Sequence, residues 1–316
     1  MKKWFFVLSV LVSATSYADC DSSGKCVWDC SPDENNPTCR ATFENGTLTI
    51  SGTGEMKDYT YHSDYDFSVR KPDTKDGYFL MTNAPWNDEF GHLNQITNLV
   101  VEEGITKIGN STLTHAVNLK SVSLPEGLEA IGTHAFYLTG LTQVELPSTL
   151  QTIGNITGSG GGSFQYTNLT SIELPEGLKT ISSSVFRSTP LESVVIPDSV
   201  EKIGNRAFLN TPNLQSIIIG DGVVSIDAEA FAGISAYIYC KDTAERSCKE
   251  LIGENNSDAF KKLKVYSIDG NGKIRIGDKV YDNLGDLPKY ISRRIYTVEE
   301  ANAVAGRINR VSITYR

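Results

Sequence analysis

A repeat of 22 or 23 residues runs through the middle of the chain and limits the folds that it can adopt. The stretch 119–136, LKSVSLPEGLEAIGTHAF, returns four times, and a weaker copy starts at Ile96. Successive copies are 23, 22, 28, 22 and 23 residues apart, and the long step contains a Gly- and Ser-rich insertion at 158–163. The register follows the isoleucine of each copy: Ile108, Ile131, Ile153, Ile181, Ile203 and Ile226. Such a period is typical of a solenoid, in which each unit buries its apolar face against its neighbours.

Each copy predicts a short strand followed by an aromatic position. Val122 and Leu124 would share one face of a strand, because side chains alternate along it. Stacked copies would form a parallel sheet over one continuous core, and the proline that follows four of the strands would end the ladder. A column of rings is expected to close the opposite wall of the core: Phe136, Phe164, Phe186, Phe208 and Phe231.

The pattern L-x-x-I-x-L-P-x-x-L-x-x-I-G-x-x-A-F resembles the bacterial surface-antigen type of leucine-rich repeat, known as BspA-like. The commoner leucine-rich repeat has an asparagine after the strand, whereas Leu128 and Leu178 occupy that region here. The resemblance covers residues 41–266, and the stretch 45–59 followed by Ala84-Pro85-Trp86 looks like the N-terminal cap of such proteins. It implies an α/β, β-rich leucine-rich-repeat solenoid with a curved parallel sheet. It also implies an extracytoplasmic, adhesive or partner-binding role without a common catalytic centre.

The first 18 residues read as a signal peptide. Lys2 and Lys3 precede an apolar run at 4–12, and Ser16-Tyr17-Ala18 is a small-x-small cleavage site. Nine apolar residues are too few to cross a hydrocarbon layer of about 30 Å. The sequence therefore predicts a secreted or extracytoplasmic protein, in the periplasm or at a bacterial cell surface.

Three units are expected after this leader: an N-terminal β cap at 19–92, the solenoid with its C-terminal cap at 93–265, and a small hairpin-helix-strand module at 266–316. Asn45-Gly46 predicts a hairpin turn within the first unit. Tyr237–Cys240 should continue the column of strands, and Asp242 can cap a helix over about 243–252.

All six cysteines lie beyond the predicted leader, and an even number outside the cytoplasm indicates disulfides. Cys240 and Cys248 form the one pair that the sequence predicts. The remaining four allow three pairings, among which the sequence does not choose: Cys20, Cys26, Cys30 and Cys39. Their spacings lack the short paired knuckles of structural zinc sites, so no metal is expected.

The net charge is −9, or about −11 without the two leader lysines, and this balance argues against nucleic acid and anionic membranes as partners. Metalloprotease, serine-hydrolase, phosphate-loop and dinucleotide motifs do not occur in the sequence. The sequence therefore predicts neither an enzyme nor a cofactor, and no other segment is apolar enough to span a membrane. The four histidines have no nucleophile motif beside them and are expected at the surface: His62, His92, His115 and His134.

Two surfaces are candidates for binding a protein or a glycan. The first consists of the outward side chains of the predicted strands, which offer hydroxyls and two carboxylates: Ser121, Ser123, Gln143, Glu145, Ser171, Glu173, Ser193 and Val195. The alternation extends this face to Asn98 and Val100 at one end and to Ser216 and Ile218 at the other. A solvated face without a ligand is the alternative.

The second surface is an aromatic and acidic segment between Tyr59 and Trp86, where the family-like cap is normally short. Rings provide contact area and carboxylates provide direction, as protein and sugar contacts require. The aromatic candidates are Tyr59, Tyr61, Tyr65, Phe67, Tyr78 and Phe79.

The sequence thus favours a binding protein on a leucine-rich-repeat scaffold. The alternatives are an extracytoplasmic structural component that self-associates and a glycan hydrolase that uses Glu145 and Glu173, which occupy equivalent positions in neighbouring repeats. The oligomeric state and the role of 266–316 stay open.

Overall fold

The structure is a computed structural model that describes residues 19–60, 82–87, 91–154, 161–242, 247–253, 256, 261, 263–268, 273–276 and 279–282. The predicted signal peptide, most of the aromatic and acidic segment, and the C-terminal helix and strand expected after 282 lie outside these residues.

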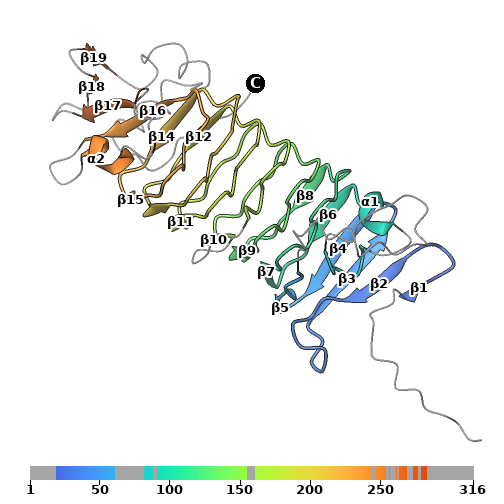
Figure 1. The fold of residues 1–316 in the computed structure, drawn as a ribbon. Coiled ribbons are helices and arrows are strands. Elements are labelled where there is room, and N and C mark those ends of the chain that lie inside the picture. The colour runs from blue at the N-terminus through green and yellow to red at the C-terminus, as the bar shows by residue number, and fades with distance from the viewer. Residues whose placement is uncertain are drawn as a thin grey trace, which may run out of the picture.

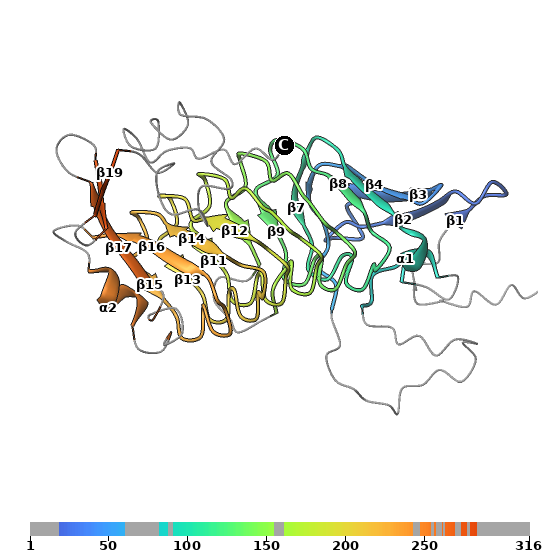
Figure 2. The ribbon, with the colours of Figure 1, turned by 90° about the horizontal axis from the view of Figure 1, so that it is seen from above.

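The chain forms a parallel β-solenoid whose coils stack side by side from the N-terminal strands to the C-terminal hairpin (Figures 1 and 2). One wall carries two ladders of strands, each in register from coil to coil, with Asn98 opposite Ser121 in one ladder and Ser193 opposite Ser216 in the other. We call this wall the first sheet. One ladder contains β6 (Asn98–Val101) and β8 (Ser121–Ser123), and the other contains β12 (Ser193–Val195), β14 (Ser216–Ile219), β16 (Tyr237–Lys241) and β17 (Leu263–Ile268). The prediction of a leucine-rich-repeat solenoid with a parallel sheet is confirmed.

Two middle coils depart from the predicted ladder. No strand is assigned over 141–147 or 169–175, where Gln143–Glu145 and Ser171–Glu173 were expected to pair. Backbone hydrogen bonds persist near the start of these segments, for example from the Thr170 amide to the Thr142 carbonyl. These coils place Glu145 and Glu173 at the same outward position, and like charges on neighbouring strands weaken the pairing.

A second parallel sheet, which the sequence analysis did not predict, forms another wall of the solenoid. Six of its seven strands end at the repeating isoleucines, which pair in register from Ile108 to Ile226. The strands are β5 (Gly54–Glu55), β7 (Ile105–Ile108), β9 (Ala130–Ile131), β10 (Thr152–Ile153), β11 (Thr180–Ile181), β13 (Lys202–Ile203) and β15 (Ser225–Ile226). Most are two residues long, which is too short to leave an alternating pattern in the sequence.

The predicted phenylalanine column is confirmed. Neighbouring rings from Phe136 to Phe231 are stacked, with centroids 5.3 to 6.0 Å apart, and all are fully buried. Phe164 keeps its place in the column although its coil carries the insertion. The rings are among the largest fully buried side chains, and each coil covers the apolar side chains of the next.

The turns that carry these rings have similar backbone conformations. In four of the five turns the residues two before and two after the ring have positive φ, as in His134 (57°) and Leu138 (55°), which flank Phe136. The same holds for Arg206 and Asn210 around Phe208. Left-handed conformations are costly for residues other than glycine. Amide groups of one turn donate to carbonyls of the next, and these bonds between coils hold the strained turns in place.

The N-terminal cap is continuous with the first sheet. Its antiparallel strands are β1 (Asp19–Cys20), β2 (Cys26–Asp29), β3 (Cys39–Glu44) and β4 (Thr47–Gly52), and β4 pairs in parallel with β6. Asn45 and Gly46 both have positive φ, as the predicted two-residue hairpin turn requires. The short helix α1 (His92–Gln95) leads from the cap into the first coil.

Disulfides fasten both ends of the solenoid. The structure pairs Cys20 with Cys26 and Cys30 with Cys39 in the cap, which settles the pairing that the sequence left open. It confirms the predicted pair, Cys240–Cys248, which links β16 to α2 (Cys248–Ile252).

The predicted cap of α2 is wrong. Ser247 begins the helix, and its hydroxyl accepts a hydrogen bond from the Glu250 amide at 3.4 Å. Asp242 instead accepts one from the Cys248 amide at 2.8 Å and thereby holds the approach to the helix. The helix is therefore shorter than the sequence predicts.

The C-terminal hairpin is joined to the solenoid sheet. β17 pairs in parallel with β16 on one side and antiparallel with β18 (Ile274–Ile276) on the other, and β19 (Lys279–Tyr281) follows. The hairpin predicted around the Gly-rich turn is thus present, and the predicted boundary at residue 266 falls inside β17.

Truncation of one ring tests the phenylalanine column. We expect Phe208→Ala to lower the free energy of unfolding by about 3–5 kcal/mol, because it leaves a cavity between two stacked rings. The control is Val224→Ala, at a side chain that is 74% exposed, which should change stability by less than about 0.5 kcal/mol. Chemical denaturation of both variants gives the comparison, and equal stabilities would show that the column is not a principal source of stability.

Candidate functional site

The outward face of the first sheet is a polar surface that the repeat builds. Ser121, Ser123, Gln143, Glu145 and Glu173 are exposed on it, as the alternation predicts. Ser171 and Ser193 are half-buried. The Ser121 hydroxyl donates to the Asn98 side-chain oxygen at 2.6 Å, so neighbouring strands are also linked across this face.

The cap lengthens this outward face beyond the repeats. Because β4 pairs with β6, Thr47 lies opposite Asn98 and Thr49 lies opposite Val100. Exposed Arg40 follows in the next strand of the cap. We therefore treat the surface from β3 to β12 as one outward face, larger than the sequence alone indicated.

An open hollow of about 500 Å³ borders this face where β6 and β8 end. Three carboxylates line it together with the Ser123 hydroxyl: those of Glu102, Glu103 and Glu126. The Glu126 carboxylate accepts hydrogen bonds from the amide and the hydroxyl of Ser148 in the next coil. The hollow therefore offers acceptors for hydrogen bonds from a partner.

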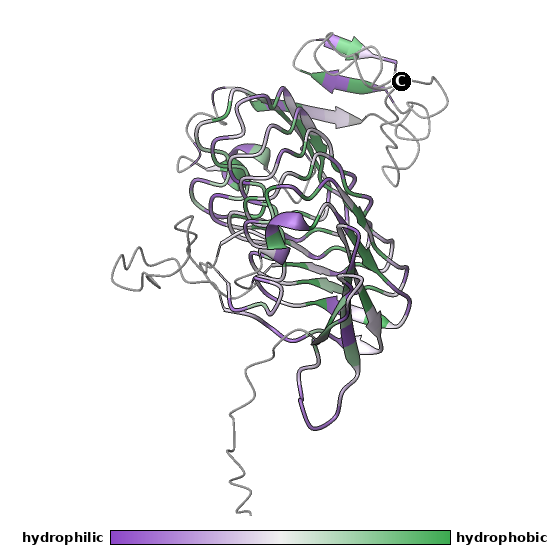
Figure 3. Cartoon of the chain, turned by 90° about the vertical axis from the view of Figure 1, so that its right-hand side faces the viewer, coloured by the Kyte–Doolittle hydropathy of each residue, from purple (hydrophilic) through white to green (hydrophobic). Residues whose placement is uncertain are grey.

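The C-terminal end of the outward face is covered. Ile218, Tyr239, Tyr266 and Ile274 form a second apolar cluster, against which Val195 and other partly buried side chains pack. Figure 3 shows the C-terminal strands beside the last coils. Ser216 and Ile218, which the alternation places outward, are therefore buried, and Val195 contacts this cluster. The prediction that they face a ligand is wrong for Ser216 and Ile218, because the sequence did not reveal that the hairpin folds back.

The aromatic and acidic segment is represented by Tyr59 alone among its candidate residues. Its ring is buried, with its centroid 5.4 Å from that of Trp86, so it belongs to the core and not to a surface. Burial, with a smaller contribution from Asp29, raises the pKa of the Tyr59 hydroxyl. The other five candidates, Tyr61, Tyr65, Phe67, Tyr78 and Phe79, lie outside the described residues.

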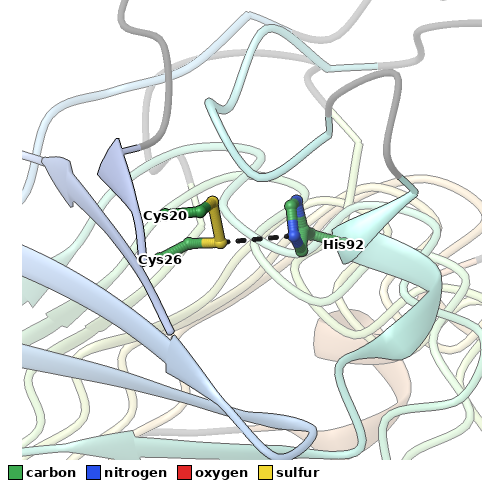
Figure 4. Close-up of side chains that lie close together, drawn as sticks. All are labelled: Cys20, Cys26 and His92. Carbon is green, nitrogen blue, oxygen red and sulfur yellow. Dashed lines mark hydrogen bonds between the residues drawn. A yellow bond between two sulfur atoms is a disulfide. The ribbon is translucent and has the colours of Figure 1, made fainter. Parts of the chain in front are cut away.

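A buried histidine touches the first disulfide. His92 Nε2 lies 3.4 Å from Cys26 Sγ, and Cys20 completes the group (Figure 4). The imidazole packs edge-on against Trp28 and Phe43, with ring centroids 5.6 and 5.3 Å away. The prediction of a surface position is wrong for His92, because α1 turns its ring into the cap.

These are three side chains that could ligate a metal, and the part of the chain that the structure describes contains no other such group. Both sulfurs are bonded to each other, whereas metals bind the thiolate form. We therefore assign no metal site to the oxidised protein.

Two more histidines lie in the turns that carry the phenylalanine column. His115 and His134 both contact Tyr137, with ring centroids 5.5 and 5.2 Å away. Burial, with a smaller contribution from His115, lowers the pKa of His134 to about 4. Burial also lowers the pKa of His115. Both imidazoles are therefore neutral near pH 7 and act as packing groups.

The two glutamates proposed for a hydrolase are both exposed on the outward face. A glycosidase acid needs an enclosed setting that keeps it protonated. Glu145 and Glu173 lack such a setting, so their geometry gives no support to hydrolysis. Within the described ranges, no helix is both long enough and apolar enough to span a bilayer.

Comparison with known families agrees with the stacked coils. A model of the BspA type leucine-rich repeat region, present in six copies, matches residues 87–159 and 157–287. The chain belongs to the BspA-type leucine-rich repeat family. No curated protein sequence matches this BspA-type protein significantly.

Three solved bacterial proteins resemble this chain to different degrees. A leucine-rich repeat protein from Eubacterium ventriosum is 21% identical with a TM-score of 0.51, over 77% of this chain and 73% of that chain. A leucine-rich cell surface protein from Faecalibacterium prausnitzii is 17% identical with a TM-score of 0.27, over 80% and 96% of the two chains. The pneumococcal vaccine antigen PcpA is 17% identical with a TM-score of 0.26, over 54% and 66%. The first of these likenesses shows the shared fold of this BspA-type protein.

The neutral state of His134 predicts a dependence of stability on pH. An unfolded chain takes up a proton at this histidine near pH 6.5, whereas the folded chain does so only near pH 4. Between these values the unfolded state binds more protons, so the free energy of unfolding should fall as the pH falls. His134→Asn should flatten this slope, since asparagine does not titrate and accepts the positive φ.

Denaturation of both proteins at a series of pH values measures the difference. The carboxylates are the same in the parent protein and in His134→Asn. The contribution of His134 is therefore the difference between the two proteins in how their free energy of unfolding changes with pH. Identical slopes between pH 6.5 and 4 would rule out this contribution.

Proposed function

We propose that the protein is a secreted or surface-exposed binding protein without catalytic activity, which recognises a protein or glycan through the outward face of its first sheet. The observation that carries the proposal is the continuity of this face. Polar side chains recur at its outward positions from Thr47 in the cap to Ser193 in the repeats, with Val100 as an apolar exception. The face of a solenoid is a usual place for binding an extended partner.

An extracytoplasmic place is part of the proposal. Three disulfides and no free cysteine among the described residues fit an oxidising compartment. The predicted signal peptide supports the same compartment.

The chemistry of the face indicates what the partner must offer. The hollow and the strands present carboxylates, those of Glu102, Glu103, Glu126, Glu145 and Glu173, beside serine hydroxyls. Carboxylates accept hydrogen bonds, so the partner should present donors: the hydroxyls of a glycan or the lysine and arginine side chains of a protein. Salt distinguishes the two, because it screens charge pairs and has little effect on a neutral glycan.

A matched pair of variants tests the face. Gln143 is exposed on it, and Gln151, eight residues later in the same coil, is exposed beside the second sheet. The purified protein is first applied to an array of host glycans and matrix proteins. Gln143→Arg should then weaken binding to the strongest ligand about tenfold or more, because a long cationic side chain obstructs the outward face and repels a basic partner.

Gln151→Arg makes the same change in charge and size and should leave the affinity unchanged. Equal effects of the two variants would contradict a site on the outward face. Concentration-dependent association in light scattering, with no binding on the array, would favour a structural, self-associating protein instead.

A further inference from the structure

We propose that the Cys20–Cys26 disulfide is a thiol-exchange site, through which the protein forms a mixed disulfide with the thiol of another molecule. The proposal does not depend on the proposed binding face, because it concerns β1 at the N-terminal edge of the cap. β1 is the edge strand of the first sheet at its N-terminal side (Figure 1), so no further strand of this sheet lies between it and an approaching thiol.

Accessibility separates this disulfide from the other two. Cys20 is exposed and Cys26 is 1% exposed, so one sulfur-bearing residue faces solvent and its partner faces the core. The other disulfides are buried at both residues: Cys30, Cys39, Cys240 and Cys248. Exchange requires access for the attacking thiolate, so only Cys20 among the six cysteines offers a target.

His92 is placed to assist the sulfur that leaves. Cys26 Sγ carries no hydrogen in the disulfide, so at 3.4 Å the contact is a hydrogen bond when His92 Nε2 donates. A thiolate formed at Cys26 would accept the same hydrogen bond more strongly, because bonds to charged acceptors are the stronger ones. Edge-on packing against Trp28 and Phe43 holds the imidazole in this position.

The step balances without an added oxidant or reductant. The incoming thiolate attacks Cys20 Sγ, and a new sulfur–sulfur bond forms there. The bond between Cys20 and Cys26 breaks, and its electron pair stays on Cys26 Sγ as a thiolate, which accepts the hydrogen bond that His92 Nε2 donates. Attack by Cys26 on Cys20 reverses the reaction and releases the thiol, so Cys26 acts as the resolving cysteine.

The fold tolerates this opening. β1 contains only two residues, which pair with Val27 and Cys26. Cys30–Cys39 and the ladder of β2, β3 and β4 remain in place when the first disulfide opens. The mixed disulfide therefore forms on a folded protein.

The test exposes the folded protein to reduced glutathione and, separately, to a peptide with one cysteine. Free thiols are then alkylated, and mass spectrometry maps each cysteine. We expect the adduct on Cys20, the alkyl group on Cys26, and the other two disulfides intact. An adduct with glutathione but not with the peptide would identify a small thiol as the partner. Adducts with both would show that the thiol of a protein can also be the partner. Loss of another disulfide first, or no adduct on Cys20, would overturn the proposal.

The role of His92 is measured with His92→Phe, which keeps an aromatic ring against Trp28 and Phe43 but removes the donor. The rate of adduct formation should fall about tenfold or more, with the same site of modification. His115→Asn removes a histidine from a turn of the repeats, where asparagine accepts the positive φ, and should leave the rate unchanged. Equal rates for the parent protein and His92→Phe would remove His92 from the exchange step.

Discussion

Stacked phenylalanine rings hold the coils of this solenoid together, and the position of each ring depends on a strained turn. The rings lie 5.3 to 6.0 Å apart from Phe136 to Phe231, and four of the five lie between two residues in left-handed conformation, whereas Phe164 has such a residue, Tyr166, on one side. A single coil without neighbours would have neither the ring contacts nor the hydrogen bonds that make such a turn favourable. The strain is therefore offset only when coils stack, which makes the array cooperative. Both sheets and the outward face follow from this stacking.

Much of the fold could be predicted because its period is repeated. The register of the rings, the parallel sheet and the Asn45-Gly46 hairpin each leave a local signal in the sequence. The second sheet could not be predicted, because strands of two residues leave no alternation, and its only signal is the isoleucine column. The left-handed turns were hidden too, since residues as different as His134 and Arg206 occupy them.

The candidate site shows where local patterns stop being informative. Alternation correctly places Ser121, Ser123 and Gln143 on the surface, because strand geometry alone decides it. Alternation fails at Ser216 and Ile218, where a distant segment, the hairpin after β17, covers the sheet. His92 was missed for the same reason: its burial depends on Trp28 and Phe43, which are far from it in sequence. Contacts between distant segments have no local signature, so the exposed face and its limits required the structure.

The two ends of the solenoid protect their sheet edges by different means. At the C-terminal end, β17 to β19 extend and fold over the sheet, and a fully buried disulfide fastens α2 against β16. At the N-terminal end, the edge strand β1 has two residues, and the exposed Cys20 joins it to β2. A short strand is itself a poor template for pairing with another chain. Cys30–Cys39 already fastens the strands beside it, so the first disulfide is not needed to hold the cap together. A bond that is accessible, dispensable for the core and in contact with a buried histidine is better suited to reaction than to support.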